Sequence, residues 1–203
     1  MSAAIETDVL IVGAGPSGMV SALCLARVGI RSIVVERASE LSAHPKAHEV
    51  NARSIEILCE LGIALEELEA EASPEADAAR IVFCRTLDDE LGRIDLLDPE
   101  NEPEKYERHL RAAKPYLNLS QTELEKTILE HVENRRETRV LFGHQWENLA
   151  DTGDRVRSAV RRPSDGVALE IVSRYVIAAD GASSLIRKAL AIPMHGPEKL
   201  QDF

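Results

Sequence analysis

The sequence predicts an α/β fold with a central parallel sheet, and three features near its start carry that prediction. Val9–Val12 is an unbroken apolar run, typical of a parallel strand covered on both faces. Three glycines follow at the GxGxxG spacing, Gly13, Gly15 and Gly18. A second apolar run then ends at Glu36. Strand, glycine-rich turn, helix and strand form a βαβ unit, which we expect to be right-handed.

The first helix has a recognisable residue at each end. Pro16 suits a first-turn position, where its missing N–H costs no hydrogen bond, and Gly29 suits the left-handed residue that closes a helix. Apolar residues recur between them at three- and four-residue steps, and they predict one packing face: Met19, Ala22, Leu23 and Ala26. The second strand is expected over residues 30–36.

The middle of the chain leaves this pattern. A helix is expected over residues 51–61, with Gly62 as its stop. Its apolar face would comprise Ile55, Leu58 and Cys59. The Glu-rich residues 65–77 continue as helix or loop. Alternating apolar positions after Arg80 predict two strands around a turn at residues 88–92, followed by a long polar excursion over residues 98–117.

Regular structure is expected again from Ser120, which forms a capping box with Glu123 at the start of a helix. A strand at residues 139–142 follows. An antiparallel meander is expected next, at residues 145–149, 155–161 and 167–172. A last strand at residues 175–179 leads to a short helix ending near Leu190, capped by Ser183 or Ser184.

Composition restricts the partners of the chain. Its 203 residues include 24 Lys and Arg against 35 Asp and Glu, a formal net charge of -11 at pH 7. Nucleic acids and anionic membranes attract basic surfaces, so we expect neither as a partner. The three widely spaced cysteines form no disulfide or zinc pattern and favour a cytoplasmic location. The histidines share no metal-ligand spacing, so no metal site is expected, and no oligomeric state is indicated.

Residues 9–26 form an 18-residue stretch without charge, near the lower limit for crossing a bilayer. Glycines and Pro16 interrupt this stretch, and Glu6 and Asp8 precede it where a signal peptide would be positive. The stretch is therefore interpreted as a buried first element.

The glycine-rich turn predicts a dinucleotide site. Gly13 would permit the tight turn, Gly15 would let a pyrophosphate approach the backbone, and Gly18 would let helix and strand pack closely. Pro16 and Ser17 begin the helix, whose exposed amides and dipole would face the phosphates. The alternative is that the glycines serve only a tight turn.

Glu36 favours dinucleotides whose ribose carries free hydroxyls rather than a 2′-phosphate. Its carboxylate at the end of the second strand can bind ribose hydroxyls, and it disfavours the 2′-phosphate of NADP, which the adjacent Arg37 alone would have allowed. A nicotinamide-binding domain usually continues βαβαβ without interruption. This chain leaves the parallel pattern after Leu61 and returns near residue 139, as a flavin-binding fold with an inserted substrate region would.

Four segments together point to a family. They are Val-Gly-Ala-Gly-Pro-Ser-Gly at 12–18 with Val-Val-Glu-Arg at 34–37, residues 45–58, Gln121 at a helix start, and Ala-Asp-Gly-Ala-Ser-Ser at 179–184 with Arg187. In this order they resemble the FAD-dependent aromatic hydroxylases, class A flavoprotein monooxygenases that include phenol, hydroxybenzoate and polyketide hydroxylases. The likeness spans essentially the whole chain.

The resemblance implies a Rossmann-like FAD-binding fold with a parallel central sheet, an antiparallel meander and an inserted part of a substrate-binding sheet. Residues 1–78 and 118–203 would form an incomplete FAD-binding domain, and residues 79–117 the insertion. Relatives carry a further Gly-Asp fingerprint beyond the Asp-Gly motif, which this sequence lacks, so we expect the N-terminal portion of a longer enzyme.

The resemblance also implies cofactor roles. The three glycines would hold the FAD pyrophosphate and Glu36 the adenosine ribose, while Lys46 and Arg53 would lie near the phosphates and ribityl chain. Gln121 would also touch FAD, and Asp180-Gly181 matches a fingerprint associated with FAD and transient NAD(P)H binding.

Each of these assignments has a plainer alternative. Lys46 and Arg53 could be solvated surface charges, and Gln121 a simple first-turn residue. Asp180 could cap the helix that follows it. Ala178 stands where relatives often have Gly, so close backbone approach there is less expected.

The implied activity is hydroxylation of a small aromatic substrate, with NAD(P)H reducing FAD and O2 supplying the oxygen atom. No catalytic acid or base is named, because the substrate pocket would combine residues 80–117 with parts beyond residue 203. Two alternatives stay open. One is another flavin oxidoreductase, a reductase or halogenase, and the other is a non-catalytic remnant that binds FAD weakly or not at all.

Overall fold

The computed structural model of the chain describes residues 4–44, 46–74, 77, 80–95, 114 and 116–196. The chain divides into two compact units, one formed by Met1–Leu41 with Val132–Phe203 and the other by Ser42–His131. The predicted division into residues 1–78 with 118–203 and an insertion at 79–117 has other boundaries and stays a prediction. No helix in the described part of the chain has the length and apolar character needed to span a membrane.

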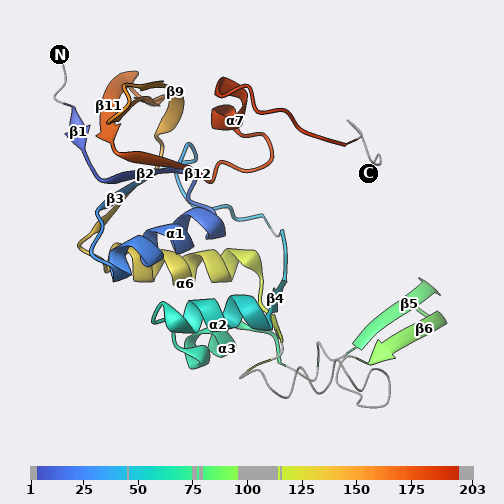
Figure 1. Cartoon of the computed structure of the whole chain (residues 1–203). Coiled ribbons are helices and arrows are strands. Elements are labelled where there is room, and N and C mark those ends of the chain that lie inside the picture. Colours follow the sequence, from blue (N-terminus) through green and yellow to red (C-terminus); the bar gives the residue numbers. More distant parts are fainter. Residues whose placement is uncertain are drawn as a thin grey trace. The chain divides into compact units, whose positions relative to one another are not determined.

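A four-stranded parallel sheet forms the centre of the first unit (Figure 1). Its strands, in spatial order, are β12 (Tyr175–Ala178), β2 (Val9–Val12), β3 (Ser32–Val35) and β8 (Thr138–Leu141). Helix α1 (Pro16–Arg27) connects β2 to β3, which confirms the predicted βαβ unit. The next parallel strand, β8, follows about a hundred residues later, so the predicted interruption of the parallel pattern is also confirmed.

A second sheet of the same unit contains the predicted meander. Its antiparallel strands are β9 (Gln145–Asp151), β10 (Val156–Arg162) and β11 (Val167–Ser173). Strand β1 (Ile5–Glu6) adds to β11 in parallel and was not predicted, because two residues form no recognisable period. The short helix α7 (Leu185–Ala189) follows β12.

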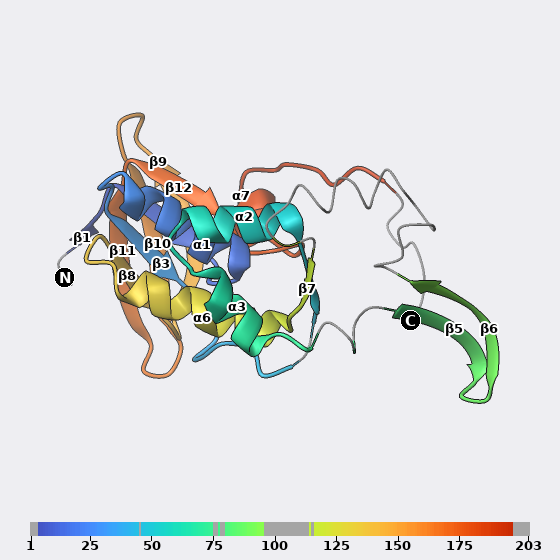
Figure 2. The ribbon, with the colours of Figure 1, turned by 90° about the horizontal axis from the view of Figure 1, so that it is seen from below.

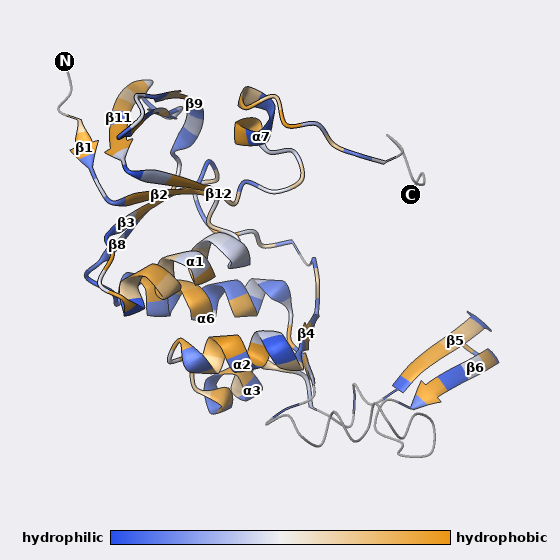
Figure 3. Ribbon diagram, viewed as in Figure 1, coloured by the Kyte–Doolittle hydropathy of each residue, from blue (hydrophilic) through white to orange (hydrophobic). Residues whose placement is uncertain are grey.

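The core of the first unit shows why these elements pack together. One buried cluster joins alternate residues of the parallel sheet to the meander and α7: Leu10, Val12, Ile33, Val35, Leu141, Trp146, Val160, Ile171 and Ile186. Ile11 and Val34 face the other side of the sheet, because side chains alternate along a strand, and α1 covers that side (Figure 1). The predicted face of α1 is buried, and β2 is hydrophobic throughout (Figure 3).

The second unit contains most of α6 (Gln121–Glu133), with α2 (Ala52–Glu60) and α3 (Leu65–Glu71). Its two short strands, β4 (Glu49–Asn51) and β7 (Tyr116–Asn118), pair antiparallel. They were not predicted, and β7 corrects the expectation of an irregular excursion up to residue 117. Residues 98–113 of that excursion lie outside the described residues.

Two helices of the second unit, α2 and α6, begin at side-chain caps. Asn51 Oδ1 accepts a hydrogen bond from Ser54 N at 2.9 Å at the start of α2, and Ser120 Oγ accepts one from Glu123 N at 3.3 Å at the start of α6. Helix α3 lies beside α6 (Figure 2), and a hydrogen bond between Glu67 on α3 and His131 on α6 joins the two helices. Cys59 is exposed, which corrects its predicted place on the buried face of α2.

Two further strands, β5 (Arg80–Thr86) and β6 (Asp89–Asp95), form the predicted hairpin. The chain turns at residues 87–88, earlier than predicted, because β6 already begins at Asp89. The apolar side chains of this hairpin are exposed, among them Phe83 and Leu91.

Candidate functional site

Three strands of the parallel sheet end level with one another. Val12 pairs with Val35 on one side and with Ala178 on the other, so Gly13, Glu36 and Ala179 follow at the same edge. Backbone hydrogen bonds of 2.8 Å, from Gly13 N to Val35 O and from Ala179 N to Val12 O, hold this edge together. Open α/β sheets bind their ligands at the carboxyl ends of the strands, which makes this edge the candidate site.

Gly13 and Gly18 allow the loop to pack against its neighbours. Gly13 has a φ of +106°, and a Cβ there would lie 2.7 Å from the carbonyl carbon of Ala179. A Cβ at Gly18 would overlap the carbonyl oxygen of Gly13. Helix α1 therefore approaches the loop, and the loop approaches the end of β12, more closely than any side chain permits. Ala178 is exposed, so the alanine there does not prevent this approach.

Gly15 lies in open surroundings, in contrast to Gly13 and Gly18. Its φ is −72°, and no atom of the described residues lies within 4 Å of the position that a Cβ would take. It is the N-cap residue of α1, where no side chain caps the helix and no acidic residue occupies the first turn. With Pro16 in that turn, the amides of Ser17 and Gly18 carry the positive end of the helix dipole. An uncapped helix start of this kind suits a phosphate.

Glu36 is attached to the glycine-rich loop. Its Oε2 accepts a hydrogen bond from Ala14 N at 3.0 Å, and its Oε1 accepts one from Ala38 N at 2.8 Å. A carboxylate oxygen can accept two hydrogen bonds, so each oxygen keeps an acceptor position for a ligand hydroxyl. The neighbouring Arg37 is exposed.

Asp180 caps α7, which confirms the plainer alternative for this residue. Its Oδ2 accepts hydrogen bonds from Leu185 N at 2.7 Å and Ile186 N at 3.3 Å. Of the two predicted serine caps, the structure uses Ser184, whose Oγ accepts from Arg187 N at 3.0 Å. Asp180 Oδ1 is buried without a hydrogen-bond partner among the described residues. Gly181 follows with a left-handed φ of +79°.

The other three predicted cofactor residues belong to the second unit. Gln121 N donates to Ala47 O at 2.7 Å, so Lys46 lies next to a residue bonded to the start of α6. Arg53 is exposed on α2 and forms an ion pair with Glu56 at 3.0 Å. Lys46 is also exposed. Cofactor contact by these residues stays a prediction.

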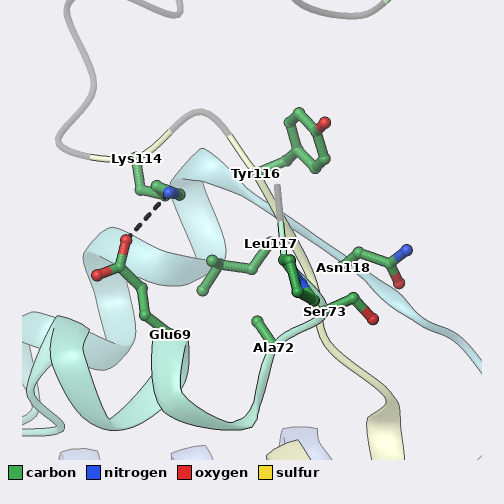
Figure 4. Close-up of a pocket in the computed structure, with 8 residues that line it drawn as sticks. Glu69, Ala72, Ser73, Lys114, Tyr116, Leu117 and Asn118 are labelled. Atoms are coloured by element: carbon green, nitrogen blue, oxygen red, sulfur yellow. Dashed lines mark ion pairs between the residues drawn. The ribbon is translucent and has the colours of Figure 1, made fainter. Parts of the chain in front are cut away.

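The second unit also contains a hollow of about 280 Å³ that the sequence did not indicate (Figure 4). It is lined by Glu69, Ala72, Ser73, Pro74, Lys114, Tyr116, Leu117 and Asn118. An ion pair of 3.0 Å joins Lys114 Nζ to Glu69 Oε1 (Figure 4). None of the predicted cofactor residues lines it. Its lining comes from α3, β7 and the segments next to them, which share no sequence motif.

Comparison with known families places the chain, including the glycine-rich loop and its sheet, in a protein family. Residues 6–203 match the model of a family described as FAD binding domain. The chain belongs to the FAD binding domain family. FAD is thus the dinucleotide that this family binds, and the fold expected from the sequence is confirmed.

Relatives of this FAD binding domain are class A flavin monooxygenases, in agreement with the resemblance in the sequence. The chain is 34% identical to 2,4-dichlorophenol 6-monooxygenase of Delftia acidovorans, over 95% of this chain and 32% of that enzyme. It is 30% identical to phenol 2-monooxygenase of Pseudomonas sp. (strain EST1001), over 90% of this chain and 30% of that enzyme.

A solved structure gives the same result for the fold. The structure of the flavin-dependent monooxygenase PieE in complex with FAD and substrate is similar to this chain, with a TM-score of 0.87 and 33% sequence identity. The match covers 95% of this chain and 33% of the PieE chain. The FAD binding domain described here therefore spans about one third of the length of the relatives it matches.

Proposed function

We propose that this chain is the FAD-binding part of a monooxygenase that hydroxylates a small aromatic molecule, phenolic or polyketide, with NAD(P)H and O2. Similarity to phenol and aklavinone hydroxylases supports the reaction and the substrate class. The observation that carries the proposal is the uncapped start of α1, with Gly15 facing open space at the carboxyl edge of a parallel sheet. The division into two domains and the cytoplasmic location are parts of the same proposal.

The residues present fit FAD. The amides of Ser17 and Gly18 would donate to the pyrophosphate, and Gly15 leaves the backbone accessible to it. Pro16 lacks an N–H and leaves no unsatisfied donor at its position. Glu36 would accept hydrogen bonds from the adenosine ribose while it still holds the loop through Ala14 N.

The remaining predicted residues would orient the rest of the cofactor. Lys46, Arg53 and Arg37 would supply positive charge near phosphates, and Gln121 a polar contact. Asp180 would act through its cap on α7, with Gly181 completing the turn. When bound, FAD supplies the redox chemistry that uses NAD(P)H and O2, and the protein residues bind and orient it.

Replacement of Gly15 by valine tests the site. Gly15→Val places a branched side chain where a Cβ meets none of the described atoms within 4 Å, and this side chain would block the pyrophosphate. We expect no FAD binding by Gly15→Val at concentrations that saturate the parent chain, measured by quenching of flavin fluorescence. Gly92→Val is the matched control, because a Cβ there also meets open space and β6 accommodates valine.

Equal FAD affinity of Gly15→Val and the parent would contradict the site. A folded parent chain that ignores FAD would instead support the non-binding remnant. The reaction has its own test in the whole protein: phenolic substrates should stimulate NAD(P)H oxidation, and no stimulation would favour a reductase or halogenase.

A further inference from the structure

We propose that Glu125 is a positioning residue that determines which way the side-chain amide of Gln121 faces, and so which ligand groups Gln121 can bind. The inference rests on the proposed contact of Gln121 with FAD. It concerns a carboxylate that neither the sequence motifs nor the proposed function uses.

Glu125 is the most buried acidic side chain among the described residues. It is 3% exposed, and it lies one helical turn after Gln121 on α6. Gln121 Nε2 donates a hydrogen bond to Glu125 Oε1 at 2.6 Å. Acidic residues are rarely buried unless they are paired, because burial removes their hydration. The amide of Gln121 is therefore a necessary partner of this carboxylate.

The chemistry of the pair fixes the orientation of the amide. A glutamine amide has a donor end and an acceptor end of nearly the same shape, whereas a carboxylate only accepts. Nε2 of Gln121 must face Glu125, so its Oε1 is directed away from Glu125. The bond from Gln121 N to Ala47 O also holds the backbone at this position. Gln121 thus presents the acceptor Oε1 on the side away from Glu125, and a donor such as a hydroxyl of the ribityl chain would bind to that oxygen.

Without the Glu125 carboxylate, the side-chain amide of Gln121 should no longer be held in one orientation. Glu125→Leu fills the buried position with a side chain of similar size, and we expect about threefold to tenfold weaker FAD binding, the effect of one hydrogen bond. Glu125→Gln keeps an acceptor oxygen and should restore part of the affinity. Glu130→Leu, an exposed glutamate on the same helix, is the matched control and should bind FAD like the parent.

A second comparison separates positioning from a general structural effect. If Glu125 acts through Gln121, then Glu125→Leu should not weaken FAD binding further in a chain that already carries Gln121→Met. A further loss of the same size in that background would overturn the proposal, because the two positions would then act independently.

The orientation can also be measured without FAD. In ¹⁵N NMR spectra of the FAD-free chain, the Gln121 side-chain amide protons should exchange slowly and resonate downfield, and both features should be lost in Glu125→Leu. Unchanged Gln121 signals in that variant would refute the inference. If the parent binds no FAD, the proposed function fails, and the spectra alone then decide whether Glu125 orients Gln121.

Discussion

Gly13 and Gly15 stand two residues apart in one loop, yet they need to be glycine for different reasons. Gly13 is constrained by the protein itself, through its positive φ and the backbone of Ala179. Gly15 has an ordinary φ and open space at its Cβ position, so the part of the chain that the structure describes leaves room for a Cβ there. The packing therefore gives no reason for glycine at position 15, whereas the proposed phosphate site does.

This contrast predicts that alanine destabilises the chain at position 13 and has little effect at position 15. Gly13→Ala should lower the free energy of unfolding by about 2 to 4 kcal/mol, because it combines a left-handed residue with overlap against backbone atoms. Gly15→Ala should change it by less than about 0.5 kcal/mol. Urea unfolding of the FAD-free variants measures both values. Equal stability of the two variants would contradict the packing described for Gly13.

Glu36 gives a prediction about affinity. Glu36→Ala should weaken FAD binding by about 1 to 3 kcal/mol, since hydrogen bonds to a charged acceptor are lost. Glu40→Ala, an exposed glutamate close by in the chain, should leave affinity unchanged. FAD titration of both variants gives the comparison. Identical titration curves would show that the carboxylate serves only the bonds to Ala14 and Ala38.

Among the elements, α3 and α6 are held together by a titratable contact. Glu67 lies in the first turn of α3, where its Oε1 accepts a hydrogen bond from Ala64 N at 3.1 Å and its Oε2 lies 2.8 Å from His131 Nε2. The hydrogen bond with His131, and then that with Ala64 N, hold the pKa of Glu67 below its usual value of 4.5. The folded state therefore favours the ionised carboxylate more than the unfolded state does.

The sign of the pH dependence follows from this. The contribution of Glu67 to stability should be complete above pH 4.5, the unfolded value, and should disappear as pH falls through the lower folded value. The difference in unfolding free energy between the parent and Glu67→Gln should shrink from pH 6 to pH 3. Glu66→Gln, in the same helical turn, is the matched control, because it leaves the hydrogen bond between Glu67 and His131 in place. A difference that stays constant with pH would contradict the assignment.

Elements with strong local signals could be predicted from the sequence, and others could not. Pro16 and Gly29 marked both ends of α1, and alternation marked the hairpin and meander. Strands β4 and β7 have three residues each and are defined by pairing across more than sixty residues, so no local pattern indicates them. The Asp-Gly motif was located, but only the structure shows that Asp180 caps α7.

At the scale of the whole molecule, the parallel sheet predicted from the sequence is present in the structure. The sequence indicated that the chain leaves the parallel pattern after Leu61 and returns near residue 139, and β8 pairs with β3 there. The glycine-rich loop, Glu36 and Asp180-Gly181 were predicted as one site, and the first unit gathers them at one sheet edge. Lys46, Arg53 and Gln121 belong to the other unit, and their contact with FAD stays a prediction.

The proposed function depends on the binding of a pyrophosphate at the start of α1. A crystal structure of the chain soaked with FAD tests this binding. We expect phosphate density within hydrogen-bonding distance of the Ser17 and Gly18 amides, with adenosine ribose hydroxyls on the Glu36 carboxylate. FAD bound elsewhere, with that helix start in contact only with solvent, would contradict it.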